Sequence, residues 1–478
     1  MDKSTKTLIH YEWKTFTRNK FQLLLLAITF VFALYAIYYG KSEINAQLDT
    51  IEAVKNLEEK EFAEYKASFQ KELVTLEQEQ THDIASRPAY AWYRHGYHAI
   101  LYPHALAPLA IGQRDLFRYY YRLTGMSLHY QLYENELANP VNLLAGNFDL
   151  SFVLIYLFPL LIITFCYGLF SSEKENGTLA LLKIQVISIR KIMLIKLAFY
   201  LAIITGLALL VSLIGILSTA NPIKSENLMA SSLWLIGAIV YCVFWFAVMF
   251  VIISFRKSSS FNAITAAGCW LFFLIVIPGM LNVIVTVKYP VSSVTLAGLT
   301  RRTGLENEDD EKEAKEVITE FLHYKPELAD SDSLIKNNLM PKAYAAFTSL
   351  KDIHNQEEVD YYNSQINKRN KWIANFYWLS PAVNMQEIFS QITETDLNTF
   401  LVFQDALVSF HRDISDFYFK RLFWDKPILL EDYSELPVFK MPKSDNRYLI
   451  VFTGLSKISL IALLAFIVGY IKINSISK

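Results

Sequence analysis

Six long runs of apolar residues alternate with polar stretches along this chain of 478 residues. Each run holds about 20 residues or more, and at about 1.5 Å per residue such a helix crosses the roughly 30 Å hydrocarbon core of a bilayer. The pattern therefore predicts six transmembrane helices. Their predicted bounds are residues 21–40, 149–170, 192–220, 228–255, 261–287 and 449–471. Two of the runs contain a proline, Pro159 and Pro278, where the helix either kinks or is accommodated by its neighbours.

Two polar stretches, residues 41–148 and 288–447, are much longer than ordinary connections between spans. The first is rich in Glu, Lys, Gln and Ala up to about Glu79, a composition that favours amphipathic helices. In the second, the pattern predicts long helices over residues 344–378 and 395–423. We therefore expect each stretch to form a large, mainly helical domain outside the bilayer.

Basic residues lie before the first run, between the second and third, between the fourth and fifth, and after the sixth. They include Lys14, Arg18, Lys20, Lys183, Arg190, Lys191, Arg256, Lys257, Lys472 and Lys478. With six spans, all four segments fall on one side, which the positive-inside rule assigns to the cytoplasm. The predicted fold class is thus an all-α polytopic membrane protein with six transmembrane helices, cytoplasmic termini and two large, mainly helical extracytoplasmic loop domains.

Residues 1–20 precede the first predicted span. Within them, Ile9, Trp13 and Phe16 recur at helical spacing, with basic residues on another face. This pattern is typical of a helix that lies in the cytoplasmic interface with its apolar side in lipid. The alternative is a simple helical extension of the first span.

Composition agrees with a membrane protein and excludes some other classes. Hydrophobic residues make up 53% of the chain, and the mean hydropathy is +0.24. The formal net charge of −1 provides no basic field for nucleic acid. Cys166, Cys242 and Cys269 all lie inside apolar runs, so we expect both polar stretches to fold without disulfides.

A short polar break, residues 171–191, separates the second and third predicted spans. Ser171 or Ser172 is the predicted N-cap of a short helix, with Glu173 and Glu175 in its first turn, where the helix dipole favours anions. Its predicted apolar face consists of Leu179, Leu181, Leu182 and Ile184. A short amphipathic helix between two spans, on the basic side of the membrane, can bind another protein and transmit force from it to the spans.

This break also resembles a known family. The matching residues are Glu173, Lys174, Glu175, Asn176, Gly177, Thr178, Leu179, Leu181, Leu182, Gln185, Ser188, Arg190, Ile192 and Lys196. Together they resemble the first cytoplasmic loop of ABC-2 type permeases, in particular the subgroup that carries a DUF3526 region. Residues 108–113, 139–142, 379–382 and 395–397 resemble the same subgroup. Val186 departs from the pattern, because the family usually has proline there.

The resemblance implies a permease subunit of an ABC-2 type transporter in the inner (cytoplasmic) membrane, with export favoured over import. It implies two partners, a separate ATP-binding subunit and a second permease subunit. The ATP-binding subunit would contact the coupling helix at residues 171–191 through Glu173, Glu175, Gly177, Thr178, Leu181 and Leu182. Two alternatives stay open: a mechanotransmission subunit that acts on extracytoplasmic partners, and a membrane sensor or scaffold that transports nothing.

The sequence offers no sign of catalysis. Gly40-Lys41-Ser42 superficially suggests a phosphate-binding loop, but Tyr35 occupies the position of the required glycine. We therefore expect no ATP-binding site, no cofactor and no enzymatic activity in this chain. His95, His98 and His104 are weak candidates for a metal site, and ordinary packing is the favoured interpretation because no cysteine or carboxylate completes the set.

Lys457 is an ionisable residue well inside a predicted span. A charge at that depth costs at least a few kcal/mol unless it is paired or reaches water. We expect Lys457 to face the bundle or a water-filled cavity, with Asp149 as a candidate partner. The alternative is that the last span begins later and Lys457 lies near the headgroups.

Overall fold

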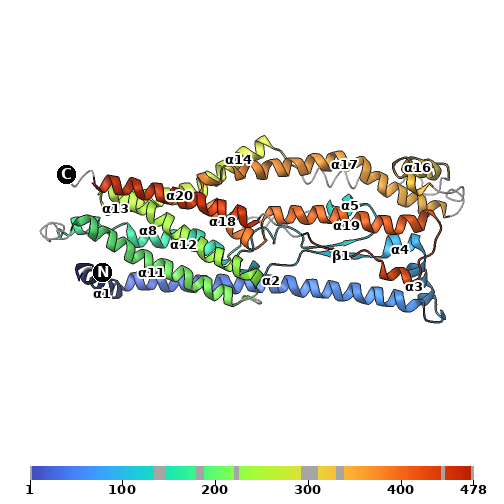
Figure 1. Ribbon diagram of the computed structural model, residues 1–478, viewed down its shortest axis with the longest axis horizontal. Helices are drawn as coiled ribbons and strands as arrows, with labels where there is room; N and C mark the ends of the chain where they lie inside the picture. Colours follow the sequence, from blue (N-terminus) through green and yellow to red (C-terminus); the bar gives the residue numbers. More distant parts are fainter. Residues whose placement is uncertain are drawn as a thin grey trace.

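The computed structural model describes residues 3–133, 147–178, 188–219, 225–291, 311–329, 338–442 and 447–474. About 79% of it is helical, which confirms a predominantly helical fold. The molecule is elongated (Figure 1): a bundle of apolar helices forms one half, and a second body of helices extends from it. Both chain termini lie at the free end of the bundle, which we call the terminal end.

Six helices in the described part of the chain are long and apolar enough to cross a membrane, as the sequence predicts. They span Lys20–Ser68, Leu150–Glu175, Ile189–Leu217, Asn227–Ser254, Ser259–Lys288 and Arg447–Ile473. The fourth belongs to α12 (Ser225–Ser254), whose apolar stretch is the most buried of the six. Trp234, Tyr241 and Trp245 of α12 are almost completely buried among its neighbours. The centre of the bundle is therefore built on α12.

The first apolar helix is longer than the sequence predicts. Helix α2 (Lys20–Ser68) has 49 residues, or about 73 Å, and runs past the predicted end at Gly40 into the second body. No proline interrupts it, and its polar half is rich in good helix formers. Gly40 serves packing: a Cβ there would lie 1.9 Å from the carbonyl oxygen of Pro108, in the 3₁₀ turn η1 (Ala107–Leu109).

Both intramembrane prolines follow a π-helical turn. Leu150–Phe152 (α7) leads through η2 (Val153–Leu157) into α8 (Phe158–Cys166), and α13 (Ser259–Leu271) leads through η3 (Phe272–Val276) into α14 (Ile277–Lys288). Because proline has no N–H, carbonyls one turn before it lose their helical donor. Side chains from other helices supply donors instead: the Tyr241 hydroxyl to the Ile155 oxygen at 3.0 Å, and the Ser380 hydroxyl to the Phe273 oxygen at 2.6 Å.

The two polar stretches do not form two separate domains, contrary to the prediction. Described residues of both share one hydrophobic cluster, and we call the body they form the distal domain. It contains the C-terminal half of α2 together with α3 (Leu76–Ser86), α4 (Pro88–Arg94), α5 (Leu128–Tyr133), α16 (Glu311–Tyr324), α17 (Leu339–Ala374) and α19 (Leu397–Phe423). Helices α17 and α19 confirm the two long helices predicted from the pattern.

The distal domain also contains a small sheet that an all-α prediction misses. Strands β1 (Tyr97–Ile100) and β2 (Tyr120–Leu123) pair antiparallel, with Tyr97 opposite Leu123. Each strand has only four residues, too few for an alternating pattern to stand out. The Tyr97 hydroxyl lies 2.6 Å from that of Tyr418, which also lies 2.6 Å from His95 Nδ1, so one buried polar group joins the two polar stretches.

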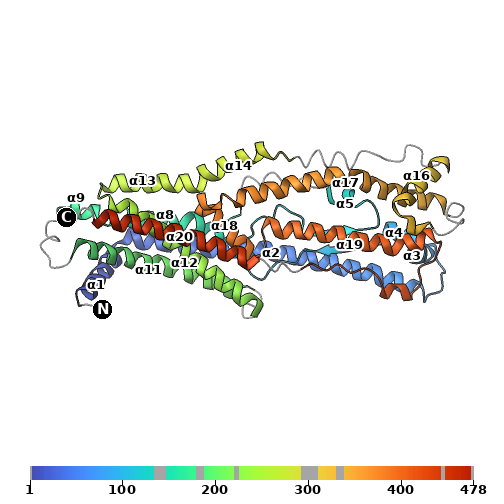
Figure 2. The ribbon, with the colours of Figure 1, turned by 45° about the horizontal axis from the view of Figure 1, so that its top comes forward.

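Helix α18 (Pro381–Ile392) joins the distal domain to the bundle. It packs against α12 and against α20 (Arg447–Asn474), and the ring of Phe389 stacks on that of Trp234 at 4.1 Å. Figure 2 shows α18 at the meeting point of the two halves. Glycines permit the close approach, since a Cβ at Gly237 or Gly454 would meet Met385 or Ile388 at less than 3.0 Å.

Candidate functional site

The described part of the predicted coupling segment, residues 171–178 and 188–191, lies at the terminal end of the bundle (Figure 2). It begins as α9 (Ser171–Glu175) and continues through a turn to Thr178. The predicted N-cap is wrong: the Ser171 and Ser172 hydroxyls donate back to the carbonyls of Tyr167 and Gly168, because α9 follows α8 through a tight turn without a cap. Leu181 and Leu182 lie outside the described residues.

Gly177 adopts a backbone conformation that favours glycine. Its φ is +72°, in the left-handed region, while a Cβ at this position would meet no atom within 4 Å. Backbone conformation, not close approach to a neighbour, therefore explains a glycine here. Thr178 follows, and its hydroxyl donates to both the backbone oxygen, at 3.1 Å, and the carboxylate of Glu173. These contacts close the turn on α9.

Glu173 ties this turn to two other helices. Its carboxylate lies 2.8 Å from Lys196 Nζ, on α11 (Ile189–Leu217), and the same ammonium lies 3.3 Å from Glu12, on α1 (Lys3–Arg18). The Lys196 and Glu12 side chains are only 15% and 5% exposed. Water therefore screens this Glu12–Lys196–Glu173 triad much less than a surface ion pair.

Glu175 ties the same turn to α13. Its carboxylate accepts hydrogen bonds from the backbone N–H and the hydroxyl of Ser259, both at 2.8 Å. Ser259 begins α13, so the carboxylate sits at the positive end of a helix dipole. Two further bonds reinforce the contact: Ser171 Oγ lies 2.7 Å from Ser259 Oγ, and the Asn262 amide donates to the Tyr167 oxygen at 3.0 Å.

The sequence identifies the right acidic residues but not their contacts. We expect from the sequence that Glu173 and Glu175 face a partner protein, whereas in the structure both carboxylates bind within the chain. Glu12 and Ser259 are the partners that sequence reasoning missed. A signal for Glu12 exists, since Glu12 and Asp2 are the two acids in a predicted interfacial segment whose other charged residues are basic. The separation of 161 positions between Glu12 and Glu173 nevertheless conceals the contact.

The predicted pairing of Asp149 with Lys457 is wrong. Asp149 is 2% exposed and accepts hydrogen bonds from the backbone N–H groups of Ile111 and Phe152 and from the Ser151 hydroxyl, at 2.7–2.8 Å. Three donors satisfy the carboxylate without a cation. Lys457 is exposed on α20, about 15 Å along the helix from Arg447, and forms no ion pair with a described residue at 4 Å or less.

The three histidines considered for a metal site lie in different environments. His95 contacts Tyr418, His98 Nδ1 lies 2.8 Å from Glu58, and His104 accepts a hydrogen bond from the Leu106 N–H at 3.2 Å. Burial lowers the pKa of His95 to about 3 and that of His104 to about 4. Within the described ranges, no group of three His, Cys, Asp or Glu residues is placed to hold a metal ion.

Comparison with known proteins gives one match. Residues 295–441 match the family described as Domain of unknown function (DUF3526), which covers α16, α17, α18 and α19. No curated protein and no solved structure matches the chain. The family match, together with the six apolar helices, indicates a multi-pass membrane protein that carries a DUF3526 region.

Proposed function

We propose that this chain is the membrane-spanning permease subunit of an ABC-2 type transporter, working as an exporter with a separate ATP-binding subunit and a second permease subunit. In this proposal the terminal end of the bundle faces the cytoplasm, and the distal domain lies outside the cell membrane. The resemblance of residues 173–196 to the cytoplasmic loop of such permeases supports the assignment. The basic residues at the terminal end support the orientation.

The observation that carries the proposal is the anchoring of α9 on both sides. Glu173 connects α9 to α11 and α1 through Lys196, and Glu175 connects it to the start of α13. A force on α9 would therefore be transmitted to three other helices at once. This is the arrangement that a partner ATPase needs to convert its own closure into movement of the spans.

A second candidate function is mechanotransmission, in which ATP hydrolysis moves the distal domain and nothing crosses the membrane. Two features favour it. Helix α2 runs unbroken from the terminal end into the distal domain, and α18 packs between the distal domain and α12. A displacement of the bundle would therefore reach the distal domain through continuous, well-packed helices.

Isolation of the tagged chain from its native membrane in mild detergent tests the proposal. We expect a protein with an ATP-binding cassette to co-purify in stoichiometric amount and to hydrolyse ATP. The variant with both Glu173→Lys and Glu175→Lys should insert normally yet lose most of that ATPase activity. An exposed pair in the distal domain, Glu77→Lys with Glu79→Lys, provides the control. Recovery of the intact chain without any such ATPase would contradict the proposal.

A further inference from the structure

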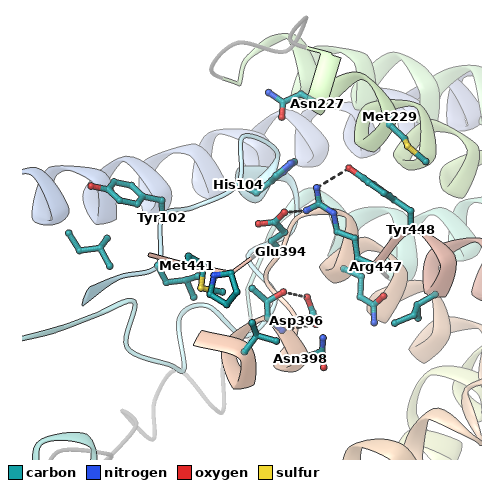
Figure 3. Close-up of a pocket in the computed structure, with 17 residues that line it drawn as sticks. Tyr102, His104, Asn227, Met229, Glu394, Asp396, Asn398, Met441, Arg447 and Tyr448 are labelled. Atoms are coloured by element: carbon teal, nitrogen blue, oxygen red, sulfur yellow. Dashed lines mark hydrogen bonds and ion pairs between the residues drawn. The ribbon is translucent and has the colours of Figure 1, made fainter. Parts of the chain in front are cut away.

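A cavity of about 720 Å³ lies where the distal domain meets the bundle (Figure 3). Its volume is within the range of about 300–1,000 Å³ that is typical of small-molecule sites. Its wall combines the loop after β1, the start of α12, the turn between α18 and α19, and the start of α20. The lining residues include His104, Met229, Gln391, Glu394, Asp396 and Arg447.

Among the described residues that line this cavity, carboxylates outnumber cationic side chains. Arg447 is the cationic side chain among the described lining residues, and it is already engaged, since it pairs with Glu394 and donates to the Tyr448 hydroxyl at 2.9 Å. Figure 3 shows both contacts. Burial lowers the pKa of His104 to about 4, so this ring is neutral at pH 7. Asp396 is left without a counter-ion among the described residues.

Asp396 is 6% exposed and stands at the N-cap of α19. Its oxygens accept hydrogen bonds from the N–H of Thr399 at 3.2 Å and from the hydroxyl of Thr399 at 2.7 Å. Burial raises its pKa, and no cation counters this effect. Burial and, secondarily, the nearby charge of Asp396 raise the pKa of a second carboxylate, Glu387. A cation in the cavity would relieve both groups.

Gln391 adds an acceptor to the same wall. Its side chain lines the cavity, is 7% exposed and donates through Nε2 to Glu387 at 2.8 Å. Its other polar atom, Oε1, is buried and accepts no hydrogen bond from the described residues. A buried acceptor without a donor costs about 1–3 kcal/mol. A donor in the cavity would recover this cost once the Gln391 side chain turns its oxygen toward the cavity.

We propose that this cavity binds an organic cation through a primary ammonium group that donates to Asp396 and Gln391. An ammonium group supplies a positive charge for Asp396 and an N–H donor for the Gln391 oxygen, whereas an anion would meet an excess of carboxylates among the described lining residues. At the rim, Met229 and Ile450 are 42% and 44% exposed and offer apolar contact for the rest of the ligand. This inference does not depend on transport, because binding is measurable on the chain alone.

Calorimetric titration of the full chain in phosphatidylcholine nanodiscs tests it, with phenylbutylammonium as the probe and empty nanodiscs as the blank. We expect saturable binding of one probe per chain and none of the uncharged analogue phenylbutanol. Asp396→Asn keeps a capping acceptor but removes the charge, so we expect at least about tenfold weaker binding. Gln391→Leu should weaken binding several-fold, and Asp413→Asn, on an exposed part of α19, should leave it unchanged.

Equal binding of phenylbutanol and phenylbutylammonium, no binding of the cation, or unchanged affinity in both the Asp396→Asn and Gln391→Leu variants would overturn the inference. If Asp396→Asn fails to fold, as judged by its melting curve, the Gln391→Leu result decides. The natural ammonium could belong to a free amine or to a lipid headgroup. Nanodiscs that contain phosphatidylethanolamine separate these sources: competition with the probe identifies the lipid, and unchanged probe affinity identifies a free amine.

Discussion

The backbone N–H and the hydroxyl of Ser259 both donate to the carboxylate of Glu175, each at 2.8 Å, across 84 positions of sequence. This contact fastens the turn after α8 to the first residue of α13. With the Glu173–Lys196 pair on the other side, it holds α9 against both α11 and α13 at the terminal end of the bundle. A force on α9 would therefore act on both helices.

The first prediction concerns the Glu175–Ser259 contact. Glu175→Ala removes both hydrogen bonds and should reduce the coupling of ATPase activity to substrate or partner several-fold, because α13 no longer follows α9. Ser259→Ala keeps the backbone N–H donor and should reduce the coupling less. The double variant should be no worse than Glu175→Ala, since that change already removes both bonds. ATPase activity of the purified complex measures this. Additive losses in the double variant would show that the two residues act separately.

The second prediction concerns Lys196, whose ammonium lies between the carboxylates of Glu12 and Glu173. Lys196→Met leaves two largely buried carboxylates unpaired, so we expect a loss of about 3 kcal/mol in the free energy of unfolding, seen as a lower melting temperature. Lys257→Met, at an exposed position of the same end, is the control. Combining Lys196→Met with Glu12→Gln and Glu173→Gln should restore much of the stability; failure to do so would argue against charge as the cause.

The third prediction is a pH dependence that originates at Glu387. Burial and, secondarily, the charge of Asp396 raise the pKa of Glu387 to about 7. Because the folded chain holds this proton more tightly than the unfolded chain, the contribution to stability is fully present below about pH 4.5 and is lost as the pH rises through about 7. Glu387→Gln should therefore raise the melting temperature at pH 8 and leave it nearly unchanged at pH 4.5.

Glu316→Gln, an exposed carboxylate on α16, provides the control for this measurement and should not alter the pH profile. A Glu387→Gln variant that melts with the same pH dependence as the parent chain would assign the effect to another group.

Local patterns explain what the sequence could predict. The six apolar helices follow from run length alone, and α17 and α19 follow from periodicity. The acidic residues of the coupling segment can be recognised from the sequence because they follow an apolar run directly. Contacts between distant positions could not be found in this way. His95 and Tyr418 meet across 323 positions to unite the distal domain, and nothing local at either residue reports the other.

The continuity of α2 was also hidden, for a different physical reason. Gly40 closes the apolar run, and a glycine after such a run usually indicates a helix end. Here the helix continues because the glycine makes room for the backbone of Pro108. Whether Gly40 ends a helix or permits close packing therefore depends on Pro108, which packs against it from another part of the chain.

The fourth prediction concerns orientation. In a background without the three native cysteines, Val74→Cys at the tip of the distal domain and Tyr361→Cys on α17 should react with an impermeant thiol reagent added to intact cells. Both positions are exposed, at 79% and 57%. Asn176→Cys, at the terminal end, should react only after the cells are opened. Labelling of Asn176→Cys in intact cells would reverse the proposed orientation.

The most direct test of α9 as the coupling element is a photo-crosslink from Asn176, which is exposed in the turn between Glu175 and Gly177. A photoreactive residue placed there should form a covalent adduct with the ATP-binding subunit in native membranes, and the yield should change when ATP is added. The same residue at Val74 should form no such adduct. An ATP-binding subunit that co-purifies with the chain yet never crosslinks to position 176 would contradict the account.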